Sequence, residues 1–137
     1  TDMKHTILST LTAFMVLLTS TLSAEPVISN VQNDDPSVKV AVYYFHYTAR
    51  CVTCKTVEKE AETSVKNFYG NKVSFQSINL DEASSKEIAK KLKVSGQSLL
   101  IVKGDKQINI TNQGFMYAKS NPEKFKSVIK ENIDPLL

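Results

Sequence analysis

Residues 40–55 read VAVYYFHYTARCVTCK and combine the strongest strand signal of the chain with its two cysteines. Their first part, up to His46, belongs to a segment that starts at Val38 and is rich in Val, Tyr and Phe. These residue types favour strands. The near-continuous apolar character from Val40 to Phe45 predicts a central strand covered on both faces. From Val52 to Tyr69 the apolar residues recur every three or four positions, which predicts a helix. The two cysteines of the chain, Cys51 and Cys54, therefore lie where this strand ends and this helix begins.

The rest of the chain continues the alternation of strand and helix. Asp81 is expected to cap the second helix, Gly114 is expected to mark a turn, and Asn121 followed by Pro122 is expected to open the last helix. The expected elements are a strand at Lys72 to Leu80, a helix lined by Ile88, Ala89 and Leu92, a strand at Gln97 to Lys103, its hairpin partner at Lys106 to Ile110, and a helix lined by Phe125, Val128, Ile129 and Ile133.

The predicted order is strand, helix, strand, helix, strand, strand, helix. A strand, helix, strand beginning implies parallel pairing through a right-handed crossover, and the hairpin adds antiparallel strands. The sequence thus predicts an α/β fold in which a mixed central sheet carries helices on both faces.

The segment before this domain predicts export. Residues 1–24 combine a basic start at Lys4, an apolar run and small residues up to Ala24, as a cleavable secretory signal does. An uncleaved N-terminal anchor is the alternative interpretation. Residues 25–37 contain two prolines and an Asn-Asp-Asp run and are expected to form an irregular lead-in, so the domain is assigned to residues 38–137. The predicted location is extracytoplasmic, in a periplasm or an equivalent oxidising compartment.

Composition excludes several classes of protein. Hydrophobic residues make up 42% of the 137 residues and charged residues 23%, which argues against a disordered chain. Two cysteines cannot form a disulfide-dense scaffold. The net charge of +3 is too small to predict a nucleic-acid partner.

The cysteine pair predicts dithiol chemistry. Free backbone N–H groups and the dipole at a helix start stabilise an anion, so Cys51 is expected to have a lowered pKa and to act as the nucleophile. Arg50 and Lys55 add positive charge nearby, and Arg50 is expected to help tune the thiolate. Cys54, one turn further along, can attack a mixed disulfide at Cys51 and resolve it.

Other interpretations of the pair stay open at this point. A structural disulfide over so short a loop would restrain the unfolded chain little. A closed zinc site needs about four ligands, more than the cysteines and His46 supply, but Cys51 and Cys54 could bind a soft metal or metalloid. Inert buried thiols are the third alternative.

Residues Val40 to Lys55, with the Asn79-Leu80-Asp81 strand ending and the segment from Val94 to Leu100, resemble the thioredoxin family over most of the chain after residue 37. The resemblance implies a thioredoxin-like three-layer sandwich, a Cys51–Cys54 redox disulfide and no organic cofactor. Within that superfamily, Tyr43 to His46 with the cysteine motif resemble a small exported group known as nitrophenyl-compound nitroreductase subunits of the ArsF type. The resemblance also implies a protein thiol or disulfide partner, with a membrane electron-carrier protein as the family expectation.

Several positions depart from the thioredoxin pattern. Arg50 stands where the family usually has Trp, and Val52-Thr53 replaces Gly-Pro between the cysteines. Tyr44 falls near the place of the family's buried acid, and His46 either partly replaces that acid or only packs at the end of its strand. Ser98 occupies the place of a cis-proline. Because a cis bond before Ser would cost about 2.5–4 kcal/mol, we expect a trans peptide there and a reshaped groove.

These observations predict an exported thiol–disulfide oxidoreductase that works through Cys51 and Cys54. The alternatives are a soft-metal or metalloid module for Cu(I) or As(III) at the same thiols, and a non-catalytic thioredoxin-like interaction subunit of a redox complex.

Overall fold

The computed structural model describes residues 39–137, so the predicted signal peptide and lead-in lie outside the described residues. The helices and strands, in chain order, are β1 (Val40–His46), α1 (Val52–Tyr69), β2 (Val73–Asn79), α2 (Lys86–Lys91), β3 (Ser98–Lys103), β4 (Lys106–Asn109), α3 (Thr111–Tyr117) and α4 (Pro122–Ile133). Short 3₁₀ turns occupy Gly70–Lys72, Ala83–Ser85 and Asp134–Leu136.

The strands form one mixed sheet in the order β2-β1-β3-β4. β1 pairs in parallel with β2, with Val40 opposite Val73, and antiparallel with β3, with Tyr44 opposite Leu99. β3 and β4 form the predicted hairpin. β1 is therefore a central strand, and the α/β class with a mixed sheet is confirmed.

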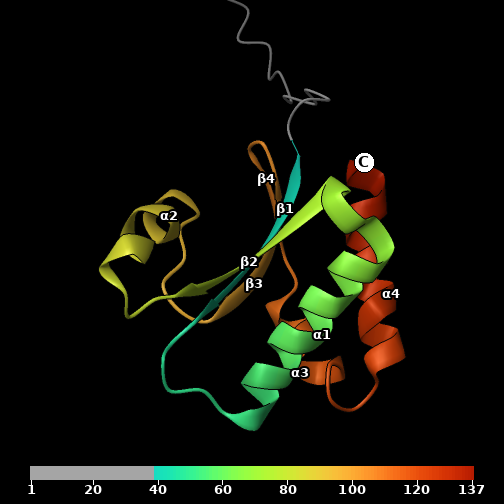
Figure 1. The fold of residues 1–137 in the computed structure, drawn as a ribbon, viewed down its shortest axis with the longest axis horizontal. Coiled ribbons are helices and arrows are strands. Elements are labelled where there is room, and N and C mark those ends of the chain that lie inside the picture. Colours follow the sequence, from blue (N-terminus) through green and yellow to red (C-terminus); the bar gives the residue numbers. More distant parts are fainter. Residues whose placement is uncertain (1–38) are drawn as a thin grey trace, which may run out of the picture. The chain divides into compact units, whose positions relative to one another are not determined.

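Helices cover both faces of this sheet, which makes three layers. Figure 1 shows α1, α3 and α4 on one side of the strands and α2 on the other. Alternate residues of β1 serve the two sides: Tyr44 packs in the larger core under α1 and α4, whereas Phe45 packs in the smaller core under α2. Both side chains are fully buried, as the continuous apolar run predicted.

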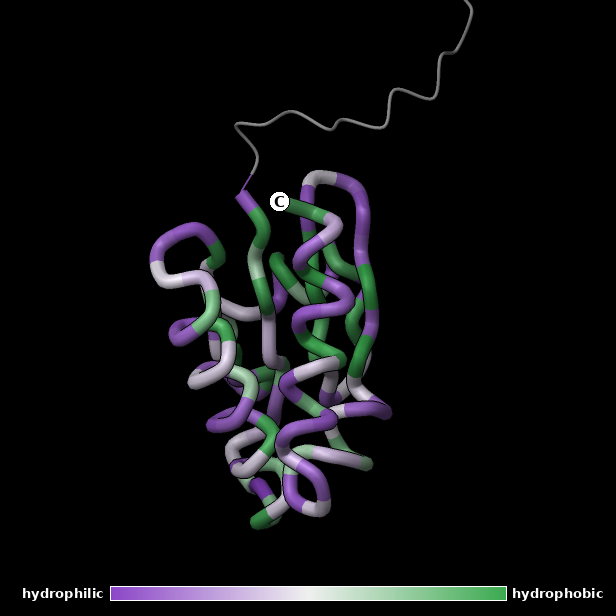
Figure 2. The backbone as a smooth tube through the Cα atoms, turned by 90° about the vertical axis from the view of Figure 1, so that its right-hand side faces the viewer, coloured by the Kyte–Doolittle hydropathy of each residue, from purple (hydrophilic) through white to green (hydrophobic). Residues whose placement is uncertain are grey.

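The long helices are amphipathic. Figure 2 shows hydrophobic and hydrophilic segments alternating along the coils of α1 and α4. α4 begins as predicted, because the Asn121 side chain accepts a hydrogen bond from the backbone N–H of Lys124 and Pro122 occupies the first turn. The predicted apolar stripe of α4 is buried: Phe125, Val128, Ile129 and Ile133.

One helix, α3, was not predicted. The prediction of a turn at Gly114 was wrong, because Gly114 is a buried residue inside α3. A Cβ at this position would lie 3.1 Å from Cγ1 of Val57 in α1 and 3.5 Å from the Phe125 ring in α4. The missing side chain therefore lets α3 approach α1 and α4 closely.

The predicted role of Asp81 as a helix cap was also wrong. The second helix, α2, begins only at Lys86, after a 3₁₀ turn. The Asp81 carboxylate instead accepts a hydrogen bond of 2.7 Å from the backbone N–H of Thr48, in the loop before α1. This bond fastens the β1–α1 loop to the end of β2. Among the described residues, no helix has the length and apolar character needed to cross a membrane.

Candidate redox site

The two cysteines form a disulfide at the junction of β1 and α1. Their Cα atoms lie 5.2 Å apart, and Cys51 occupies the N-cap position of α1. Cys51 is exposed, whereas Cys54 is only 7% exposed. The disulfide thus presents one sulfur-bearing residue to the surface and holds the other in the protein.

The backbone at the helix start is arranged to stabilise negative charge on Cys51. The N–H of Cys54 donates a hydrogen bond of 3.2 Å to Sγ of Cys51, so this sulfur serves as the side-chain cap of α1. The first turn of α1 contains no acidic residue. In the reduced protein the same N–H and the helix dipole would favour a thiolate over a thiol at this position.

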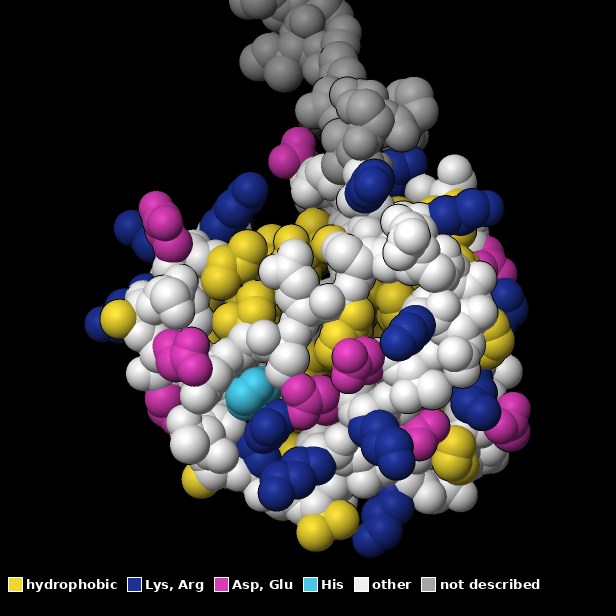
Figure 3. All heavy atoms as spheres, viewed as in Figure 1, with side chains coloured by type: hydrophobic (Ala, Val, Ile, Leu, Met, Phe, Trp, Pro, Cys, Tyr) yellow, Lys and Arg dark blue, Asp and Glu magenta, His cyan; other side chains and the backbone are white. Residues whose placement is uncertain are grey.

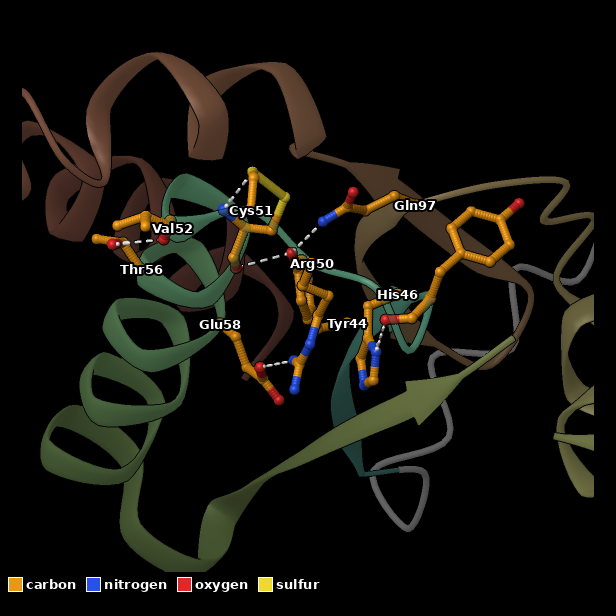
Figure 4. Close-up of a disulfide and its surroundings, with 10 residues drawn as sticks. Tyr44, His46, Arg50, Cys51, Val52, Thr56, Glu58 and Gln97 are labelled. Atoms are coloured by element: carbon orange, nitrogen blue, oxygen red, sulfur yellow. Dashed lines mark hydrogen bonds and ion pairs between the residues drawn. A yellow bond between two sulfur atoms is a disulfide. The ribbon is translucent and has the colours of Figure 1, made fainter. Parts of the chain in front are cut away.

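A buried tyrosine lies behind the disulfide. The Tyr44 hydroxyl donates to the backbone carbonyl of Cys54 at 2.8 Å and accepts a hydrogen bond from the side-chain amide of Gln97. Figure 4 shows Gln97 reaching from the loop before β3 toward this hydroxyl. Burial raises the pKa of the Tyr44 phenol. A neutral phenol thus links three segments that are distant in sequence.

An ion pair lies on the other side of Tyr44. Arg50 pairs with Glu58 of α1, and Glu58 also accepts a hydrogen bond from the Ser77 hydroxyl of β2. Figure 4 shows the Arg50 side chain running away from the disulfide toward Glu58. In the disulfide form, the positive charge of Arg50 is therefore paired with the Glu58 carboxylate.

His46 lies at the end of β1 and is 7% exposed. Its Nδ1 lies 2.9 Å from the carbonyl oxygen of Tyr47, and its ring packs 5.9 Å from the Tyr44 ring. The loop after it is held by Asn79, whose side-chain amide donates to the hydroxyl of Thr48. These contacts hold the His46 ring in place at the end of its strand.

The remaining predicted residues surround the cysteines. Val52 and Thr53 form the start of α1, with Val52 71% exposed and Thr53 half-buried, and Lys55 is exposed. Ser98 begins β3, and its hydroxyl donates to the carbonyl of Gly96 at 2.9 Å. The described residues contain no cis peptide bond, so the expected trans bond between Gln97 and Ser98 is confirmed.

Sequence reasoning missed two residues of this site, Glu58 and Gln97. Glu58 follows Cys54 by four positions, so helical spacing alone places it on the same side of α1. In the sequence, however, Glu58 is only one of several charged residues of this helix, and nothing local distinguishes it from Glu60 or Glu62. Gln97 had no comparable signal, because it reaches Tyr44 across 53 positions of sequence.

A metal site larger than the cysteine pair would need further ligating side chains around it. Within residues 39–137, no group of three or more His, Cys, Asp or Glu side chains is placed to hold a metal ion. Acidic and basic side chains lie interspersed on the face shown in Figure 3. An exposed cysteine bonded to a buried one can exchange disulfides with a thiol that approaches from solution.

Several solved structures are distantly similar to this chain. The chain matches no protein-family model and no curated protein. Trxlp from Edwardsiella tarda EIB202 is one similar solved structure, at 15% identity and a TM-score of 0.49, and the match covers 68% of this chain and 84% of that one. A malarial protein is another, at 23% identity and a TM-score of 0.40, covering 50% and 74% of the two chains. Likenesses this low show neither activity nor partner.

Proposed function

We propose that this chain is a thioredoxin-like thiol–disulfide oxidoreductase whose working group is the Cys51–Cys54 pair. One observation carries the proposal: an exposed Cys51 at the N-cap of α1 is disulfide-bonded to a buried Cys54 one turn further along. The helix start favours the thiolate of Cys51 as both leaving and attacking group. The observed sheet order, with the pair after the central strand, agrees with the fold that the thioredoxin resemblance implies.

The exchange proceeds in two balanced steps. A substrate thiolate attacks Sγ of Cys51, a bond between substrate and Cys51 forms, and the Cys51–Cys54 bond breaks with Cys54 leaving as a thiolate that takes up a proton. A second substrate thiolate then attacks the substrate sulfur of this mixed disulfide, so Cys51 leaves. The substrate dithiol is oxidised by two electrons and the cysteine pair is reduced. Run backwards, the same steps reduce a substrate disulfide.

The proposal extends to location and partner. Export rests on the signal-like pattern of residues 1–24, and a membrane electron-carrier protein as redox partner rests on the resemblance to the thioredoxin superfamily. Membership of the exported ArsF-type group rests on Tyr43 to His46 and the cysteine motif. In an oxidising compartment a reductase must use such a partner, because the pair otherwise stays a disulfide.

Single-cysteine variants test the chemistry. Cys51 alone, in Cys54→Ser, should react with a small disulfide reagent at least about tenfold faster than Cys54 alone, in Cys51→Ser, because it is exposed and stabilised as a thiolate. Mixed disulfides with a cysteine peptide should accumulate in Cys54→Ser, since the resolving thiol is missing. Reaction of Cys51 no faster than that of a free cysteine near neutral pH, with no mixed disulfide, would refute the proposal.

Two further measurements address the other functions. A Cys51→Ser, Cys54→Ser double variant that keeps full function in the host would indicate an interaction subunit instead. Stoichiometric Cu(I) or As(III) binding by the reduced protein, lost in either single variant, would indicate the metal or metalloid module.

A further inference from the structure

The charges beside the disulfide form a pair that is neutral as a whole. Arg50 contributes one positive charge and Glu58 one negative charge, and their side chains are 23% and 20% exposed. Because both are partly buried, solvent screens them less than it screens charges on the open surface. A neutral pair of this kind exerts a much weaker field on a nearby thiolate than a lone guanidinium would.

Glu58 is held in this position from two elements. It lies on α1, seven residues after Cys51 and four after Cys54, so it falls on the same side of the helix as both cysteines. Ser77 of β2 binds its other carboxylate oxygen. Glu58 thereby draws the Arg50 side chain along the helix and away from the disulfide, as Figure 4 shows.

Few other titratable groups surround the cysteines. Lys55 of α1 is exposed, and Tyr44 and His46 come from β1. α3, which also packs against α1, contains Tyr117 but no acidic or basic residue, and β2 contains no titratable side chain. α4 packs against α1 as well, and its charged residues include Glu123 paired with Lys126 and Lys130 paired with Asp134. Glu58 is therefore the one carboxylate of α1, β1 and α3 that pairs with the charge next to Cys51.

We propose that Glu58 is a positioning residue that limits the reactivity of Cys51 by holding the Arg50 guanidinium away from its sulfur. The inference rests on the proposed function and adds the residue that tunes its nucleophile. With Glu58 present, the thiolate of Cys51 is stabilised mainly by the helix start. Without it, the freed guanidinium adds its full charge to that stabilisation.

The test is the pKa of Cys51, measured in the full chain by following the ultraviolet absorbance of the thiolate. All variants carry Cys54→Ser, so that Cys51 is the one thiol that titrates. Glu58→Gln should lower the pKa of Cys51 by about half a unit to one unit, the effect of one charge within about 10 Å in a partly solvated site. Arg50→Gln should raise it, because an unpaired carboxylate remains. Arg50→Gln combined with Glu58→Gln should return it close to the starting value.

The matched control is Glu62→Gln, which removes an exposed carboxylate one turn further along α1 and should leave the pKa of Cys51 nearly unchanged. In the protein with both cysteines, Glu58→Gln should also shift the glutathione equilibrium toward the reduced form, since a more stable thiolate favours it.

The outcomes separate this inference from the proposed function. Equal shifts in Glu58→Gln and Glu62→Gln, or a double variant that stays at the Glu58→Gln value, would overturn the role of Glu58. Should Glu58→Gln not fold, Ser77→Ala takes its place: it removes the second bond that holds Glu58 and should lower the pKa of Cys51, and an unchanged pKa overturns the inference. A Cys51 that reacts like a free cysteine in every variant refutes the proposed function instead.

Discussion

At the residue scale, Tyr44 connects the cysteine helix with the loop that precedes β3. Its ring is fully buried in the larger core, and its hydroxyl bonds both the Cys54 carbonyl and the Gln97 amide. A buried hydroxyl is stable only when it is hydrogen-bonded, so this residue ties local packing to the geometry of the disulfide. Because burial raises the pKa of its phenol, Tyr44 acts as a neutral support and not as a base near neutral pH.

Tyr44→Phe should therefore destabilise the protein without changing its shape. The loss of the two hydrogen bonds, with the Gln97 donor left without its protein partner, is expected to cost about 1–2 kcal/mol in the free energy of unfolding, measured with urea. Tyr47→Phe is the control, because that ring is 42% exposed and its hydroxyl makes only a 3.4 Å contact with Ser95. Equal stability of Tyr44→Phe and the natural protein would contradict this account.

At the scale of elements, α3 shows how packing can create a helix that local sequence does not announce. Its sequence, TNQGFMY, contains Thr, Asn and Gly, which are poor helix formers. The helix forms where Gly114 lies against Val57 and Phe125, so the contacts with α1 and α4 compensate for low propensity. The other helices and strands have strong periodicity or strand-forming residues, and their presence and order were predicted correctly.

Gly114→Val is the test of this packing. The new side chain would press on Val57, which is fully buried, and overpacking of this kind costs about 1–3 kcal/mol. The measurement is the midpoint of urea unfolding. Asn112→Val is the control, because Asn112 lies at an exposed position of the same helix and Val and Asn have similar helix propensities. This variant should change the free energy of unfolding by less than about 0.5 kcal/mol. Because Val is a better helix former than Gly, a loss in Gly114→Val can come only from packing, and unchanged stability of this variant would contradict the close approach of α3.

At the scale of the whole molecule, two carboxylates fasten segments that are distant in sequence. The backbone N–H of Thr48 lowers the pKa of Asp81 below its ordinary value of 3.8, and this contact holds the loop before α1 to the end of β2. The Tyr69 hydroxyl lowers the pKa of Asp134 in the same direction, and it joins the ends of α1 and α4. Both bonds require an ionised carboxylate to keep their full strength.

Acid should therefore loosen both contacts. A carboxylate with a depressed pKa in the folded state stabilises that state above its unfolded pKa, and the contribution is lost as pH falls through the folded pKa. The free energy of unfolding should therefore begin to decline as the pH falls below about 5 and should keep declining as it passes through the lowered pKa values of the two carboxyls. In Asp81→Asn and Asp134→Asn this decline should be smaller, because an amide does not titrate. Asp105→Asn, in the turn between β3 and β4, is the control and should keep the natural pH profile.

Residue types and periodicity within short windows were enough to predict the central strand, the long amphipathic helices, the hairpin and the place of the cysteine pair at a strand–helix junction. The partners of the polar side chains became known only from the folded structure. Arg50 could have faced Cys51 but pairs with Glu58, Asp81 could have capped a helix but bonds Thr48, and Gln97 reaches Tyr44. Such choices depend on distances across the folded sheet and helices, which the local spacing of residues, such as that of Cys54 and Glu58, does not fix.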